Sequence, residues 1–164
     1  MKPPFAVMAA SLVALSVAGP AFADPPAEAS HLVLLAEDLV FVDGPAALPP
    51  GAKIAVLEGD PSREGPFTMR LLLPAGYRIP PHLHPTVERL TVLSGTFYLG
   101  VGDTLDERAA TAMPAGGYFS MPARMHHYAF TREQTMVQLH GIGPWEIIYL
   151  DPADDPRQPA GAPR

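Results

Sequence analysis

The sequence predicts an all-β protein, an antiparallel sandwich or barrel of short strands. Its 164 residues include 21 prolines and 14 glycines. Prolines at this density leave little room for long helices, because each one removes a helical donor and clashes with the preceding turn. Short apolar runs recur along the chain with turn residues between them, and no long window shows the apolar periodicity of a helix. The length is that of one domain.

The composition excludes several classes of function. The chain has no cysteine, which rules out disulfide scaffolds, thiolate zinc sites and cysteine nucleophiles. Its formal net charge is −6, and an acidic chain without a basic run is a poor candidate for binding nucleic acid. Hydrophobic residues make up 48% of the sequence, which is typical of a globular chain and not of a disordered one.

Residues 1–23 are predicted to be an export signal. Lys2 supplies the positive start, an apolar stretch covers residues 5–19, and an A-x-A motif ends at Ala23. This pattern predicts cleavage between Ala23 and Asp24. The apolar stretch is shorter than the roughly 20 residues that a membrane anchor needs. The mature protein is therefore expected to be periplasmic or secreted, with no membrane partner after cleavage.

The mature chain is predicted to consist of an arm, a barrel and a tail. The N-terminal arm, residues 24–50, has one apolar run followed by prolines, which favours a loosely packed segment with a short edge strand or helical turn. The barrel covers residues 51–150, and the tail, residues 151–164, is expected to be exposed. Apolar runs that predict strands in the barrel are 54–57, 67–73, 87–93, 96–101, 117–121, 125–131, 135–140 and 147–150.

Three local features of the barrel follow from these runs. Ser94-Gly95 separates two adjoining runs, which is typical of a hairpin. Gly143-Pro144-Trp145 is interpreted as a turn followed by an anchoring aromatic residue. Apolar residues that alternate in the two runs around Gly95 are predicted to lie in the core: Leu90, Val92, Phe97 and Leu99.

Two histidines and a glutamate form a dense motif in the middle of the chain. Gly76, His82, His84, Glu88 and Gly95 give the pattern G-x5-H-x-H-x3-E-x6-G. Side chains alternate along a strand, so His82 and His84 point to one face, and strand parity would keep Glu88 on that face. Two imidazole nitrogens and a carboxylate oxygen are ligands of the kind found at open non-haem iron sites. The motif therefore predicts a site for a divalent metal.

A second segment, about thirty residues further on, extends this pattern. Gly116 is followed by Pro122 and then by His127. At this point the chain resembles the cupin superfamily, whose motifs are G-x5-H-x-H-x3,4-E-x6-G and G-x5-P-x-G-x2-H-x3-N. The first motif matches at every position. In the second, Arg124 replaces the glycine and Thr131 replaces the asparagine.

The resemblance covers about residues 67–150 and implies a jelly-roll barrel of two antiparallel sheets with one metal at its mouth. Carried over residue by residue, the implied ligands are His82, His84, Glu88 and His127. The missing glycine normally serves a tight turn, so either Arg124 adopts an unusual backbone conformation or the turn is reshaped.

Two choices between neighbouring residues stay open. His126 competes with His127 for the fourth ligand position; the family spacing favours His127, and strand alternation then directs His126 outward. Gln138 and His140 share one face of the next predicted strand. If that face is inside the barrel, they bind a ligand in the pocket; if it is outside, their neighbours line the interior.

The predicted function depends on the metal. The ligand types admit Fe, Mn, Co, Ni, Cu or Zn, and an ion with open positions can activate dioxygen, polarise a substrate or lower the pKa of bound water. The leading hypothesis is an exported metal-dependent oxidoreductase of the dioxygenase kind that acts on a small organic molecule. The alternatives are a non-catalytic module that binds a carboxylate or a sugar, and a metal-free barrel. A homodimer, in which the arm covers a sheet edge of the partner, is also predicted.

Overall fold

The computed structural model describes residues 31–158. The chain separates into two units, residues 1–33 and 34–164, and nearly all described residues belong to the second unit. The predicted signal peptide and the last residues of the predicted tail lie outside the described part. No helix within residues 31–158 is long and apolar enough to cross a membrane.

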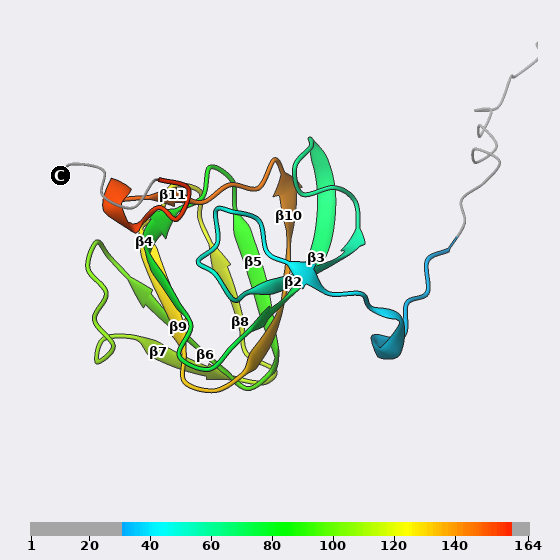
Figure 1. The fold of residues 1–164 in the computed structure, drawn as a ribbon, viewed down its shortest axis with the longest axis horizontal. Coiled ribbons are helices and arrows are strands. Elements are labelled where there is room, and N and C mark those ends of the chain that lie inside the picture. The colour runs from blue at the N-terminus through cyan, green and yellow to red at the C-terminus, as the bar shows by residue number, and fades with distance from the viewer. Residues whose placement is uncertain (1–30, 159–164) are drawn as a thin grey trace, which may run out of the picture. The chain divides into compact units, whose positions relative to one another are not determined.

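Two antiparallel sheets face each other and form the barrel (Figure 1). The six-stranded sheet has the order β1 (Val42–Asp43), β2 (Lys53–Glu58), β3 (Gly65–Leu73), β10 (Thr135–Gly143), β5 (Glu88–Ser94), β8 (Tyr118–Met121). The five-stranded sheet has the order β11 (Ile148–Tyr149), β4 (Arg78–Leu83), β9 (His127–Thr131), β6 (Thr96–Val101), β7 (Thr111–Pro114). Two short 3₁₀ turns, Ala36–Asp38 and Pro152–Asp154, complete the described elements. The predicted all-β, double-sheet jelly-roll class is confirmed.

The chain alternates between the sheets, and this changes one prediction. From β3 to β6, each strand lies in the sheet opposite to the strand before it. The turn at Ser94-Gly95 therefore leads from β5 in one sheet to β6 in the other, and the predicted hairpin is wrong. Gly95 has φ +71°, a backbone conformation that glycine adopts without strain. The local turn signal was present, but tertiary packing decided the pairing partners.

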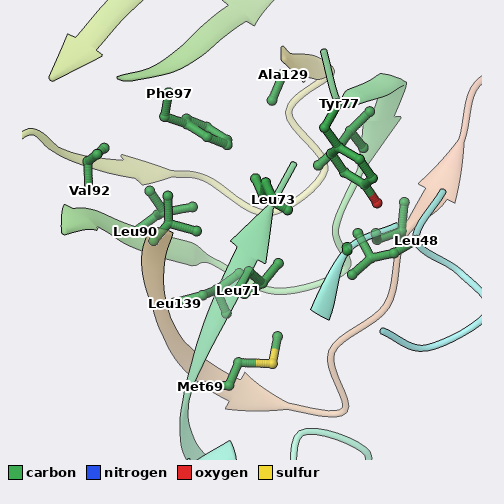
Figure 2. Packing of buried hydrophobic residues seen from close by; sticks show 14 of the residues in the cluster. Leu48, Met69, Leu71, Leu73, Tyr77, Leu90, Val92, Phe97, Ala129 and Leu139 are labelled. Carbon is green, nitrogen blue, oxygen red and sulfur yellow. The ribbon is translucent and has the colours of Figure 1, made fainter. Parts of the chain in front are cut away.

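The inner faces of both sheets supply the hydrophobic core. Burial alternates along β3 and β10, so that every second side chain points inward. Of the residues predicted for the core, Leu90, Val92 and Phe97 are buried, and Leu99 packs against them while partly exposed. Figure 2 shows Leu71, Leu90 and Leu139 meeting between the strands.

The end of the predicted arm is packed, not loose. Leu48 is only 4% exposed and belongs to the core cluster. Two tyrosine hydroxyls hold the backbone on either side of it: Tyr77 donates to the carbonyl of Pro49 at 2.6 Å, and Tyr149 donates to the carbonyl of Ala47 at 2.7 Å. Figure 2 shows the Tyr77 hydroxyl directed toward the segment that carries Leu48. This segment therefore forms part of the barrel wall.

Candidate metal centre

Three histidines meet inside the barrel because two neighbouring strands present them at the same level. His82 lies on β4 and His127 opens β9, and the two residues pair directly in the antiparallel register. His84 follows the end of β4, two residues after His82. All three are buried, and one nitrogen from each ring lies within 4.8 Å of the others. Each ring can therefore give one ligand atom to a common metal ion.

Backbone carbonyls fix the proton on each of these rings. The Nδ1 atom of every ring lies within hydrogen-bond distance of a carbonyl oxygen, which can only accept. Nδ1 therefore carries the proton, and Nε2 keeps a free lone pair for a metal. The carbonyls belong to Pro80 for His82 (2.7 Å), Glu146 for His84 (2.6 Å) and Met125 for His127 (2.9 Å).

Glu88 approaches the histidines from the opposite sheet. It is the first residue of β5, and it is buried. One carboxylate oxygen lies 3.4 Å from His84 Nε2 and the other lies 3.5 Å from His127 Nε2. Strand parity with His82 and His84 is thus not what brings Glu88 to the site. The chain crosses from one sheet to the other between β4 and β5, so the carboxylate faces the imidazoles across the barrel interior.

The protonation states of the cluster suit a cation. Burial lowers the pKa of His82 to about 3, and the neighbouring His127 and His84 add to this effect. Burial alone would raise the pKa of Glu88, but the adjacent histidines outweigh it and lower the pKa to about 2. At neutral pH the His82 imidazole is therefore neutral and the carboxylate is ionised, which are the forms that bind metal.

The cluster lies in a cavity that is otherwise almost entirely apolar. The space open to the centre of a water molecule is about 20 Å³, enough for about one water-sized group. Trp145 lines this cavity, and its indole stacks on the His84 ring with 5.5 Å between centroids and 22° between planes. The apolar wall is formed by Leu48, Leu71, Leu73, Ile79, Leu90, Phe97, Phe119, Ala129, Val137, Leu139 and Ile147.

An unpartnered nitrogen supports the fit of a metal. His84 Nε2 is buried and has no hydrogen-bond partner among the described residues, since an unprotonated Nε2 and the nearby Glu88 carboxylate oxygen can both only accept. A buried polar atom without a partner is costly, and a metal ion would satisfy it. The donor set of three imidazoles and one carboxylate matches a divalent transition metal. The residues present therefore fit the divalent metal ion that the sequence predicts.

The turn between Pro122 and His127 survives the loss of its glycine. Arg124 occupies the glycine position with φ +64°, the left-handed conformation that an L-residue adopts at a cost. Its backbone N–H donates to the carbonyl of His84 at 2.8 Å. This bond ties the loop that leads into β9 to the segment that carries the first two histidines. Of the two outcomes expected for Arg124, the unusual backbone conformation is the one observed.

His126 lies outside the cluster. Its side chain is 41% exposed and its Nδ1 lies 2.6 Å from a carboxylate oxygen of Asp103. His127, the neighbour favoured by the family spacing, is the residue that joins His82 and His84.

Thr131, which stands in the asparagine position, is buried and donates to the carbonyl of Pro74 at 2.6 Å. That residue therefore supports the fold and does not touch the cluster.

Gln138 and His140 do not line the cavity, and their prediction as pocket residues is corrected. Val137 and Leu139, which alternate with them on β10, are buried and form part of the apolar wall. Gln138 accepts a hydrogen bond from Arg70 Nε at 3.2 Å on the outer face of the sheet. Facing inward, the polar pair would be buried among aliphatic residues without partners, which is unfavourable.

Sequence reasoning missed two residues of the cavity. Trp145 was expected only to anchor a turn, although it is the one tryptophan of the chain and follows Pro144. Leu48 gave no signal, because it lies in a proline-rich segment outside the strand pattern. Its place in the wall depends on contacts with Tyr77 and Tyr149, which are distant in the sequence.

Comparisons with known proteins agree with this architecture. The chain has the cupin fold of a polyketide cyclase, RemF from Streptomyces resistomycificus (TM-score 0.62, 16% identity, 77% of this chain and 90% of that chain). It is also similar to an acetylacetone dioxygenase from Acinetobacter johnsonii (TM-score 0.59, 18% identity, 82% and 87%). A third similar structure is an RmlC-like cupin from Shewanella frigidimarina (TM-score 0.54, 16% identity, 70% and 91%).

At these identities the structural likeness shows the fold alone. No curated protein matches the chain by sequence. One family is matched over residues 50–152, and its description is domain of unknown function DUF4437. This match covers the strands that carry all four predicted ligands. The chain therefore has the cupin fold, and it belongs to the DUF4437 family.

Proposed function

We propose that this protein is a metal-dependent oxidoreductase of the dioxygenase kind that acts on a small, largely apolar organic molecule. One observation carries the proposal: His82, His84 and His127 each hold the proton on Nδ1 against a backbone carbonyl, which leaves the Nε2 atoms free beside an ionised carboxylate. Such a site is preorganised for a metal, because neither the tautomers nor the orientations of the rings have to change on binding.

His82, His84, His127 and Glu88 would hold the metal. A bound divalent ion with open positions would supply a Lewis acid at which substrate and dioxygen can meet. The residues around the ion control its surroundings in two ways. The aliphatic wall excludes water from the reacting groups, and Glu88 contributes the negative charge that offsets part of the charge of the ion. Dioxygen is the oxidant, and in dioxygenase chemistry both of its atoms end in the products.

The lining of the cavity supports a substrate that presents a small, weakly polar group to the metal site, because the space beside the cluster admits about one water-sized group. Apart from the four predicted ligands and Trp145, every residue of the wall is aliphatic or phenylalanine. Small-molecule sites typically bind a ligand through a mainly apolar lining, and a few polar groups fix its orientation. An acetylacetone dioxygenase is among the proteins of similar fold, and short diketones are small and weakly polar. We therefore choose short β-dicarbonyl compounds as the first substrates to test.

The alternative, a non-catalytic module that clamps a carboxylate or a sugar, is less well supported. A sugar presents several hydroxyl groups, each of which needs a hydrogen-bond partner when buried. Among the described residues that line the cavity, Trp145 is the only one beyond the predicted ligands whose side chain has a hydrogen-bonding atom, its Nε1. A carboxylate needs fewer partners, so a carboxylate clamp is the version that competes with the enzyme. It predicts stabilisation by the ligand without turnover.

The experiment compares metal content and oxygen uptake in matched variants. The untagged protein is purified beside His82→Ala/His84→Ala and beside His126→Ala/His140→Ala, which removes two histidines outside the cluster. Elemental mass spectrometry is expected to find about one equivalent of metal in the protein and the control pair, and almost none in the first variant. An oxygen electrode then measures uptake with acetylacetone and other short β-dicarbonyl compounds.

The outcomes separate the hypotheses. Metal with oxygen uptake, both lost in His82→Ala/His84→Ala, is the expected result. If carboxylates stabilise the metal-loaded protein but no compound gives oxygen uptake, the enzyme hypothesis is rejected in favour of the binding module. No metal in any sample, even after reconstitution with Fe²⁺, Mn²⁺ or Zn²⁺, would reject both functions.

A further inference from the structure

The only tryptophan of the chain has a buried hydrogen-bond donor with nothing to bind. Within residues 31–158, two buried side-chain polar atoms lack a partner: His84 Nε2 and Trp145 Nε1. Both side chains line the same cavity. The metal proposed above accounts for His84 Nε2. It cannot account for Trp145, because the indole nitrogen is a donor only and does not ligate a metal.

The indole is held firmly beside the metal site. Its ring stacks on the His84 imidazole, with the centroids 5.5 Å apart. The backbone N–H of Trp145 donates to the carbonyl of Pro61 at 2.7 Å, which fixes the loop. The carbonyl of the next residue, Glu146, accepts from His84 Nδ1 at 2.6 Å. The same short segment therefore orients one predicted ligand and places in the cavity wall an indole whose Nε1 has no partner.

We infer that Trp145 is a binding residue whose Nε1–H donates to a small anionic oxygen ligand, a carboxylate or enolate, that enters the cavity and takes an open position on the metal. The inference rests on the proposed metal site and adds a recognition element to it. The donor suits an anion because hydrogen bonds to charged acceptors are stronger than those to neutral ones. The cavity of about 20 Å³ restricts the group beside it to a small one.

The single tryptophan allows a direct test with formate as the probe. In ¹⁵N-labelled, Zn²⁺-loaded protein, the one indole N–H gives one resonance, which Trp145→Phe removes and so identifies. Adding formate is expected to move this resonance downfield, because a donor that gains an anionic acceptor is deshielded. An indole resonance that stays in place while formate binds would overturn the inference.

Affinity is measured in parallel on Co²⁺-loaded protein through the visible spectrum of the ion. Replacement of Trp145 by its benzothiophene analogue keeps both fused rings and exchanges the N–H for a sulfur atom, which cannot donate a hydrogen bond. Formate is expected to bind about tenfold or more weakly to this protein and to Trp145→Phe, with the Co²⁺ content unchanged. Phe119→Leu serves as the matched control, since it alters the wall of the same cavity without removing a donor.

The results distinguish this inference from the proposed function. If neither Zn²⁺ nor Co²⁺ binds, the metal site fails and the role of Trp145 fails with it. If the metals bind and formate has the same affinity with and without the N–H, only the role of Trp145 is rejected. If Phe119→Leu weakens formate as much as the benzothiophene analogue does, the effect belongs to the cavity shape and the inference is also rejected.

Discussion

The two sheets of the barrel contribute unequally to the cavity between them. The five-stranded sheet and the loop after β4 bring the three imidazoles and a smaller part of the apolar wall, while the six-stranded sheet brings the larger part of that wall and one carboxylate, Glu88. The side chains that meet across the rest of the core are hydrophobic. A metal held by His82, His127 and Glu88 would therefore join the two sheets, and binding would stabilise the folded state.

The largest effect is expected from the five-stranded sheet. His127→Ala should weaken metal binding by at least about a hundredfold, since changes to groups that merely support a ligand already cost about 10–100-fold. Isothermal titration with Zn²⁺ measures the affinity, and calorimetry measures the rise in Tm that the metal causes. His126→Ala, one residue away and exposed, should leave both unchanged. Equal losses in the two variants would mean that the cluster does not hold the ion.

The six-stranded sheet should show the opposite pattern. Leu139→Ala removes a side chain that is 1% exposed and lines the cavity, so the free energy of unfolding should fall by about 2–5 kcal/mol. Its metal content should remain that of the unchanged protein. Ile142→Ala on the same strand, at a site 53% exposed, should change stability by less than about 0.5 kcal/mol. Urea unfolding gives both values. If Leu139→Ala contained no metal, the apolar wall would also be needed for metal binding, and the two sheets would not have separate roles.

A smaller effect is expected from the two tyrosines that hold the segment around Leu48. Burial raises the pKa of Tyr77, with a contribution from Tyr149, and burial likewise raises the pKa of Tyr149, with a contribution from Asp155. Their folded pKa values thus lie above the unfolded value of about 10. The stability that they contribute is fully present below pH 10, and it is lost as the pH rises further, because only the unfolded chain releases the protons.

Urea unfolding at a series of pH values should therefore give a falling free energy above about pH 10. Tyr77→Phe/Tyr149→Phe should flatten that fall. It should also lower stability near neutral pH by about 1 kcal/mol for each hydrogen bond lost. Tyr118→Phe, at an exposed site, is the control and should leave the alkaline slope in place. A slope that the double variant does not change would show that other groups cause it.

The smallest effect is expected from the loop that links the two motif segments. Arg124→Gly relieves a left-handed residue, which costs roughly 1–2 kcal/mol, but it also increases the freedom of the unfolded chain by about 0.4–1 kcal/mol. The net result should be a gain of up to about 1 kcal/mol, measured by urea unfolding, with metal affinity unchanged. A loss of stability would mean that the arginine side chain makes a contribution that outweighs the backbone strain.

The sequence predicted the class of fold and the residues of the cluster, because these depend on local spacing. His82 and His84 are two residues apart on one segment, and His127 was implied by the resemblance to the second cupin motif, which fixes its distance from Gly116. What depends on the crossing between sheets was not predictable in this way. Glu88 reaches the histidines from the opposite sheet, and Ser94-Gly95 connects the sheets instead of closing a hairpin. Periodicity alone could not decide which face of β10 is inside; burial of Val137 and Leu139 decided it.

The position of Leu48 means that the matched family domain does not enclose its own cavity. The match to the family begins at residue 50, yet Leu48, two residues earlier, forms part of the wall, and the backbone on either side of it is held by hydroxyls from β11 and from the residue before β4. A chain that begins at residue 50 would keep every predicted ligand and have an opening beside them. One part of the chamber wall is thus encoded outside the stretch that carries the predicted ligands, so a substitution at Leu48 is expected to change the shape of the cavity while the predicted ligand set stays the same.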